Sequence, residues 1–163
     1  MNHPQGPLVI AYDGSAAARQ AVAEAAELMG SRRALVLTVW EAGLAYATGM
    51  PADGFATVPT VDPETAHEVD RGLHEQAEGI SREGAQLAQS LGLEAESLAV
   101  SDDSDVARTI LHVAREHKAA AIVVGSRGLG GLLARLEGST SKSLLRHAPC
   151  PVLVVHERDE GGD

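Results

Sequence analysis

The sequence predicts a single α/β domain, built on an open five-stranded parallel sheet with helices on both faces. Short apolar runs alternate along the chain with helical segments, and strict alternation of this kind is typical of parallel strands joined by helical crossovers. Most of the runs are continuously apolar, as expected of strands that are buried on both faces. The length of 163 residues fits one domain, since a domain takes roughly 100–200 residues.

Composition and charge exclude several classes of protein. Apolar residues make up 44% of the chain and aromatic residues 2%, so we expect a globular core of Val, Leu, Ile and Ala. The net charge of −10 argues against a nucleic-acid partner or an anionic membrane surface. No stretch approaches the ~18 apolar residues of a membrane span, and residues 1–7 show no signal peptide. The single cysteine, Cys150, suits a reducing compartment, so we expect a soluble cytoplasmic protein.

Turn and cap residues divide the first half of the chain. The expected elements are, in order, a strand at 8–12, a helix at 16–29, a strand at 34–40 and a loop at 41–62. Ser15 is the expected N-cap of the first helix, and Gly30 is the glycine that ends it. The loop is rich in Gly and Pro, and loops longer than ~12–15 residues are usually lids, binding loops or disordered segments.

The second half continues the alternation. The expected elements are a helix at 63–91, a strand at 93–100, a helix that ends at 117, a strand at 119–124, a helix at 139–147 and a strand at 152–155. Pro63 is a good first residue for its helix, and Ser104 is the expected N-cap of the next one. The strand at 93–100 is less apolar than the others, so we expect it nearer an edge of the sheet.

A candidate binding motif follows the strand at 119–124. It consists of two glycines separated by two residues, nine spacer residues, a third glycine and a hydroxyl residue: Gly125, Gly128, Gly138 and Ser139. In an open parallel sheet, ligands bind beyond the carboxyl ends of the strands. Glycines let backbone N–H groups approach a ligand, and the N-terminus of the helix at 139–147 would attract an anion. The hydroxyls of Ser139 and Thr140 would lie near a phosphate oxygen.

Local charge favours the same interpretation. Residues 125–150 carry four basic side chains and one acidic side chain, within a chain of net charge −10. The alternative is that the glycines serve only the turn and the serine only caps the helix, and position and spacing alone do not decide between the two. A Walker A loop and a dinucleotide fingerprint are both excluded, since no Gly-Lys pair occurs and Leu133 stands where the fingerprint needs glycine.

At this motif the sequence resembles the universal stress protein (UspA-type) family. Nucleotide-binding members of that family carry Gly, two residues, Gly, nine residues, Gly and Ser or Thr, and this chain matches that pattern without a gap. The resemblance extends to residues 9–15 at the first strand–helix junction and to residues 147–155 near the end of the chain. It implies one domain over residues 7–156, with flexible tails at 1–6 and 157–163.

The resemblance also implies a fold and a set of ligand contacts. The fold is the Rossmann-like sheet of the adenine nucleotide alpha-hydrolase-like kind, with strands one and four adjacent at its centre. The ligand is ATP, with Mg²⁺ or Mn²⁺ bridging its phosphates and with no metal ligand assigned to the protein. The residues that the resemblance assigns to nucleotide binding are Ala11, Tyr12, Asp13, Val39, Val124, Gly125, Arg127, Gly128, Gly138, Ser139 and Thr140.

Two functions remain open. The first is a nucleotide-binding regulatory protein of the stress response, without catalytic residues, in which ATP occupancy changes conformation or partner choice. The second is an enzyme on the same fold, a slow ATPase or a phosphoryl- or nucleotidyl-transferase. Phosphoryl transfer needs a group that orients the attacking nucleophile as well as a clamp on the phosphates, and only Asp13 is a candidate for that role. We therefore expect the regulatory protein.

The last expected strand predicts a partner. A short apolar strand from Val152 to Val155 at the edge of a sheet would leave its backbone groups unpaired. Members of the resembling family pair this strand with its counterpart in a second subunit. The resemblance therefore implies a homodimer through this strand.

Overall fold

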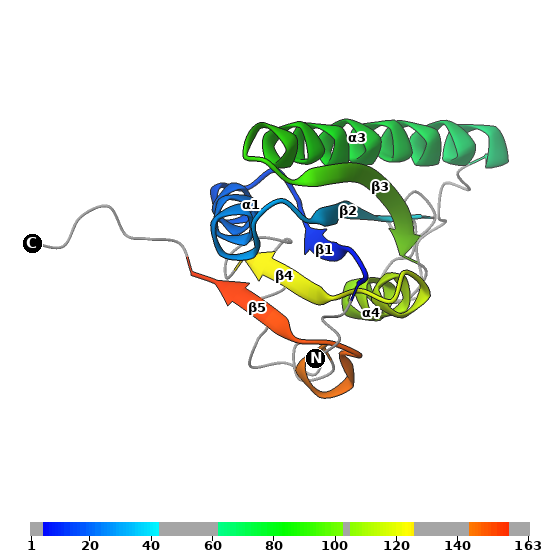
Figure 1. The fold of residues 1–163 in the computed structure, drawn as a ribbon. Helices are drawn as coiled ribbons and strands as arrows, with labels where there is room; N and C mark the ends of the chain where they lie inside the picture. The colour runs from blue at the N-terminus through cyan, green and yellow to red at the C-terminus, as the bar shows by residue number, and fades with distance from the viewer. Residues whose placement is uncertain (1–4, 43–61, 103–104, 126–143, 157–163) are drawn as a thin grey trace, which may run out of the picture.

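The computed structural model describes residues 5–42, 62–102, 105–125 and 144–156. Its five strands form one sheet in the order β3-β2-β1-β4-β5, and each neighbouring pair runs parallel (Figure 1). The elements are β1 (Leu8–Ala11), α1 (Ala16–Met29), β2 (Arg33–Glu41), α3 (Pro63–Ser90), β3 (Glu94–Asp102), α4 (Val106–Glu116), β4 (Ala121–Gly125) and β5 (Val152–Val155). A further helical turn covers residues 144–147. The predicted parallel α/β fold is confirmed.

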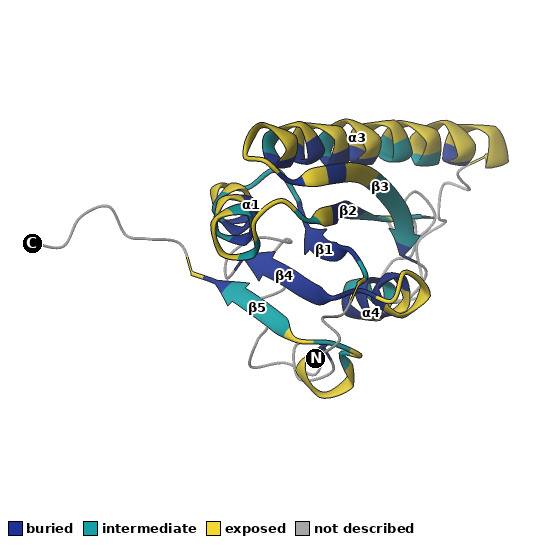
Figure 2. Ribbon diagram, in the orientation of Figure 1, coloured by how far each residue is buried: buried dark blue, intermediate teal, exposed yellow. Residues whose placement is uncertain are grey.

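Burial follows the position of each strand in the sheet. Every residue of the central strands β1 and β4 is buried, as their continuous apolar runs predict. The edge strands β3 and β5 are partly exposed, as Figure 2 shows. The lower apolar content of β3 therefore does reflect an edge position. This strand runs on to Asp102, beyond the expected end at residue 100, because it pairs with β2 in register from Arg33↔Glu94 to Glu41↔Asp102.

Helices cover both faces of the sheet. One cluster of buried side chains joins the sheet to α1 and α3, and a second joins the opposite face to α4 and Leu144. In Figure 1, α1 and α3 accordingly lie on one side of the sheet and α4 on the other. This arrangement follows from right-handed crossovers whose direction reverses after β3. No helix in the described ranges is long and apolar enough to cross a membrane.

The predicted ends of α1, at Ser15 and Gly30, and the predicted start of α3 at Pro63 are confirmed. Ser15 has an extended backbone, and its Oγ accepts a hydrogen bond of 3.1 Å from the amide of Ala18. Gly30 ends α1 with a positive φ of 67°, a conformation that favours glycine. The Asp62 carboxylate accepts from the amide of Glu64 at 2.8 Å, directly before Pro63 at the first helical position.

The predicted cap of α4 is wrong by one residue. Asp105, not Ser104, is the N-cap, and its Oδ1 accepts a hydrogen bond of 2.9 Å from the amide of Ala107. The amide of Asp105 in turn donates to the carboxylate of Asp102, at the end of β3. β3 extends two residues further than expected, to Asp102, and the hydrogen bond to this carboxylate holds Asp105 at the cap position.

Candidate functional site

The candidate site lies where the order of the strands reverses. The chain passes from β1 through β2 to β3 at one edge and then returns to place β4 beside β1, in register from Leu8↔Ala121 to Ile10↔Val123. Ligands of open parallel sheets bind at such a reversal, outside the carboxyl ends of the strands. The adjacency of strands one and four, implied by the resemblance, is confirmed. It brings the residues after β1 and the end of β4 to the same edge of the sheet.

The turn after β1 is held by its own side chains. Asp13 Oδ1 accepts a hydrogen bond of 2.9 Å from the amide of Ser15, and Gly14 between them has a φ of +79°. A positive φ favours glycine, since a Cβ would strain the backbone there. Asp13 itself is half-buried. The turn leads directly into α1, whose first amides have no acceptor within the helix and so face the site with partial positive charge.

Gly125 packs against the first turn of α1. A Cβ at this position would lie 2.7 Å from the carbonyl oxygen of Ala17, which is too close for any side chain. The end of β4 therefore touches the helix whose N-terminus follows Asp13. This contact explains the glycine by packing alone, and it also leaves the backbone here without a side chain that would stand between it and a ligand.

Three of the predicted nucleotide-binding residues share one face. Ala11, Val39 and Val124 all belong to the cluster on the α4 side of the sheet, where Ala11 and Val124 are buried and Val39 is partly buried. They come from the three neighbouring strands β1, β2 and β4. The structure thus brings these side chains together at the carboxyl edge.

Tyr12 points the other way. Its ring is fully buried in the cluster on the α1 and α3 side. Its amide donates to the carbonyl oxygen of Leu37 at 2.8 Å, its carbonyl oxygen accepts from Thr38 Oγ1 at 2.8 Å, and its hydroxyl donates to Glu83 Oε1 at 2.9 Å. All of its polar atoms therefore have partners inside the protein.

Glu83 links Tyr12 to α1. Its Oε1 also accepts from Arg19 Nη2 at 2.9 Å, which makes a salt bridge between two half-exposed side chains. The hydrogen bond from Arg19, and then that from Tyr12, lower the pKa of Glu83. Burial, followed by the hydrogen bond to Glu83, raises the pKa of Tyr12 to about 12. Both shifts keep the pair in its hydrogen-bonded form at neutral pH.

Sequence reasoning missed Thr38, Glu83 and Arg19. Thr38 gives a weak signal, since it is the one hydroxyl in the apolar run at 34–40, and a buried hydroxyl needs a hydrogen-bond partner. Glu83 stands 71 residues from Tyr12, so no local pattern indicates their contact.

Trp40, the residue after Val39, packs against α3. Its ring centroid lies 5.5 Å from that of His74, at an interplanar angle of 52°. Trp40 Nε1 and His74 Nδ1 are buried, and neither has a hydrogen-bond partner among the described residues. The indole is therefore positioned to report on changes at this edge of the sheet.

The remaining predicted contacts, Arg127, Gly128, Gly138, Ser139 and Thr140, lie outside the described residues. Their roles stay predictions. Within the described ranges, no group of three or more His, Cys, Asp or Glu side chains could hold a metal ion.

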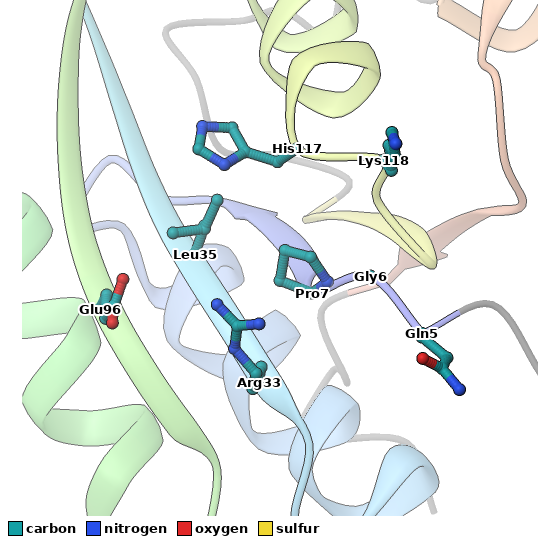
Figure 3. A pocket seen from close by; sticks show the side chains of 8 residues that line it. All are labelled: Gln5, Gly6, Pro7, Arg33, Leu35, Glu96, His117 and Lys118. Atoms are coloured by element: carbon teal, nitrogen blue, oxygen red, sulfur yellow. The ribbon is translucent and has the colours of Figure 1, made fainter.

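A separate hollow of about 660 Å³ lies at the opposite edge of the sheet, where β1, β2 and β3 begin. Figure 3 shows Arg33 and Glu96 on neighbouring strands, with His117 and Lys118 following α4. Its lining residues are Gln5, Gly6, Pro7, Arg33, Leu35, Glu96, His117 and Lys118. The lining mixes opposite charges and contains none of the predicted site residues, so the hollow is not the candidate site.

Known proteins resemble this chain over nearly its whole length. The model of the Universal stress protein family matches residues 6–156. A universal stress protein of Thermus aquaticus is 32% identical over 155 residues, which cover 91% of this chain and 96% of the relative. The universal stress protein YxiE of Bacillus subtilis is 28% identical over 148 residues, which cover 91% of this chain and 97% of the relative.

Solved structures share the fold. The universal stress protein UspA from Lactobacillus plantarum has a TM-score of 0.67 at 22% identity, with 94% of this chain and 99% of that chain covered. A universal stress protein family protein from Arabidopsis thaliana, solved with AMP bound, has a TM-score of 0.60 at 18% identity, with 95% and 94% covered. A universal stress protein in complex with cAMP has a TM-score of 0.58 at 22% identity, with 95% and 99% covered.

At 18–22% identity, the likeness to the solved structures shows a shared fold. Membership of a family is shown by the family model and by the Thermus relative. The family model spans the sheet from before β1 to the end of β5, and the Thermus relative covers 91% of the chain. This chain belongs to the universal stress protein family.

Proposed function

We propose that the chain binds an adenine nucleotide, with ATP as the expected ligand, across the carboxyl ends of β1 and β4. The observation that carries the proposal is the reversal of strand order, which sets the Asp13–Ser15 turn beside Gly125 and the N-terminus of α1. The AMP and cAMP complexes of proteins with the same fold support an adenine nucleotide.

The described residues suit such a ligand. Val39, partly buried beside the buried Ala11 and Val124, offers an apolar side chain to a purine. Asp13 and the N-terminus of α1 lie where ribose or phosphate oxygens would follow. We assign the phosphates to Arg127 and to the motif Gly128, Gly138, Ser139 and Thr140. Mg²⁺ or Mn²⁺ would neutralise the phosphate charge through the nucleotide rather than through a protein metal site.

We further propose that the protein regulates rather than catalyses. Asp13 is the one candidate to orient a nucleophile among the predicted contacts, and its Oδ1 already accepts the amide of Ser15. A slow ATPase, or a phosphoryl- or nucleotidyl-transferase, is the second candidate function, because a carboxylate at a phosphate site can still orient water. Turnover measurements separate the two.

A homodimer through β5 is part of the same proposal. β5 is an edge strand with partly exposed side chains from Val152 to Val154, and its outer backbone groups can pair with a second copy. The amide of Ile122 donates to Pro151, so the backbone groups of Val152 and Val154 face away from β4, and Val154→Pro would block pairing of that edge. Light scattering should give twice the mass of the chain for the wild-type protein, whereas a monomer at micromolar concentration would refute the dimer. We place the protein in the cytoplasm, where its free thiol, Cys150, stays reduced.

The first experiment is to denature the purified protein and identify any released nucleotide by mass. Recovered ATP supports a binding protein with little or no hydrolysis, whereas recovered ADP or AMP supports the enzyme. Binding of added ATP with Mg²⁺ is then followed by the fluorescence of Trp40, the single tryptophan of the chain. Gly138→Val should abolish binding, while Gly79→Ala, at an exposed helical glycine with open space around it, should not. Unchanged affinity in Gly138→Val would overturn the site.

A further inference from the structure

We propose that Tyr12, Thr38 and Glu83 form an anchor that positions the Asp13–Ser15 turn for the nucleotide, without touching the nucleotide themselves. The inference rests on the proposed function, and it changes the role of Tyr12 from a ligand contact to a positioning residue. It also adds two residues to the site that neither the motif nor the family pattern indicates.

The anchor begins where the strand ladder stops. Paired residues of β1 and β2 end at Ala11↔Leu37, so the next residue, Tyr12, lies beyond the regular ladder. Its amide still donates to Leu37, and the hydroxyl of Thr38 takes over as donor to its carbonyl oxygen. Thr38 is 6% exposed, so this hydrogen bond is shielded from water. The backbone is therefore fixed on both sides of the Tyr12 Cα, one residue before Asp13.

The side chain of Tyr12 fixes the same residue from the other direction. Its ring is fully buried beneath α3, and Glu83 of that helix accepts a hydrogen bond from its hydroxyl. Gly84 makes the close approach possible, since a Cβ there would lie 2.7 Å from a ring carbon of Tyr12. The same Glu83 carboxylate binds Arg19 on α1, the helix that follows the turn. The residue before the turn and the helix after it are thus both tied to one carboxylate on α3.

This arrangement has a consequence for binding. A turn held in one conformation loses less entropy when a ligand binds than a turn that fluctuates, so pre-organisation strengthens affinity. Thr38→Val removes one hydrogen bond and leaves the carbonyl oxygen of Tyr12 buried without its donor, and Tyr12→Phe removes the bond to Glu83. A net hydrogen bond corresponds to a change of about fivefold in affinity, so we expect either variant to bind ATP roughly three- to tenfold more weakly.

The test measures ATP affinity in Thr38→Val and Tyr12→Phe and includes two controls. Thr38→Ser keeps the hydroxyl and should restore most of the affinity. Val113 is buried near the C-terminal end of α4, toward the edge of the sheet where the strands begin, so Val113→Ala lowers stability away from both the anchor and the candidate site and should leave the affinity unchanged. Weaker binding in Val113→Ala to the same extent would show that general destabilisation is the cause and would overturn the proposal.

A second readout needs no ligand. The amides of Ser15 and Ala18 donate to side chains within the turn and its cap, so their hydrogen exchange reports on the turn directly. Thr38→Val should speed their exchange more than that of Ala107, the equivalent cap amide of α4. If the wild-type protein binds ATP while Thr38→Val changes neither affinity nor exchange, the anchor is refuted and the proposed function stands. If the wild-type protein does not bind ATP, the proposed function fails, and exchange alone decides whether the anchor exists.

Discussion

Three glycines on one helix allow a sharp test of how α3 packs on the sheet. Gly72 and Gly79 are exposed and have no atom within 4 Å of an added Cβ. Gly84 is buried, and a Cβ there would lie 2.7 Å from both a Tyr12 ring carbon and Cγ1 of Val36. The same change, Gly→Ala, should therefore have opposite effects on stability at Gly79 and at Gly84.

The expected magnitudes follow from two competing contributions. Replacing a helical glycine by alanine stabilises a helix by about 1 kcal/mol, and at Gly79 nothing opposes that gain. Overpacking a core costs roughly 1–3 kcal/mol. We expect the upper end at Gly84, because the Tyr12 ring is fully buried and tied to Glu83 and cannot swing aside. The net result at Gly84 is then a loss of about 2 kcal/mol.

Thermal unfolding followed by circular dichroism and by the fluorescence of Trp40 measures both variants against the wild-type protein. Gly79→Ala should raise the melting temperature by roughly 2–4 °C, and Gly84→Ala should lower it by roughly twice that amount. Gly72→Ala serves as a second exposed control and should behave like Gly79→Ala. A Gly84→Ala protein as stable as Gly79→Ala would refute the close approach of α3 to Tyr12, and with it the packing argument for the anchor.

Three further predictions concern single groups. The absorbance of the Tyr12 phenolate should appear only near pH 12 and be absent from Tyr12→Phe. Because the unfolded chain releases this proton near pH 10, the free energy of unfolding should fall as the pH rises from 10 to 12. A rise in the Tyr12 phenolate absorbance near pH 10 would contradict the buried hydroxyl. The pKa of Glu83 is lowered from 4.5, so its contribution to stability is complete above that pH and is lost on acidification. Glu83→Gln should therefore lose less stability than the wild-type protein as the pH falls below 4.5. An equal loss in the two proteins would count against the contact with Arg19. Asp105→Ala should lower the free energy of unfolding, measured with urea, by about 1 kcal/mol, while Ser104→Ala should leave it almost unchanged. The reverse result would show that Ser104 is the N-cap, as the sequence predicts.

The fold was open to prediction because its main signals are local. Apolar runs indicate the strands, and Ser15, Gly30 and Pro63 mark helix ends through backbone preferences that act within a few residues. The wrong N-cap prediction at Ser104 shows what local signals cannot determine. Two adjacent residues can both cap a helix, and the length of β3, which is set by pairing with β2, decides between them.

The candidate site was predictable only in part, for a related reason. Asp13 and Gly125 could be placed at one edge because the carboxyl ends of parallel strands meet there, once strands one and four are taken as neighbours. The contacts of Glu83 could not be predicted, because they depend on the path of α3 across the sheet. That path is fixed by the close approach of α3 to the sheet at Gly84, and nothing in the sequence distinguishes Gly84 from the exposed Gly79.

The alternation of side chains along a strand divides the site between the two faces of the sheet. Ala11 and Tyr12 are consecutive and therefore point to opposite faces, one toward α4 and the other toward α3. Val39 and Thr38 on β2 divide in the same way. The proposed ligand side and the anchor side thus meet only through the backbone between β1 and the Asp13 turn. A change in that backbone on nucleotide binding would reach α3 through Tyr12 and Glu83. Substitutions at Glu83 should accordingly change affinity from the far side of the sheet, whereas substitutions at exposed positions of the same helix, such as Gly79, should not.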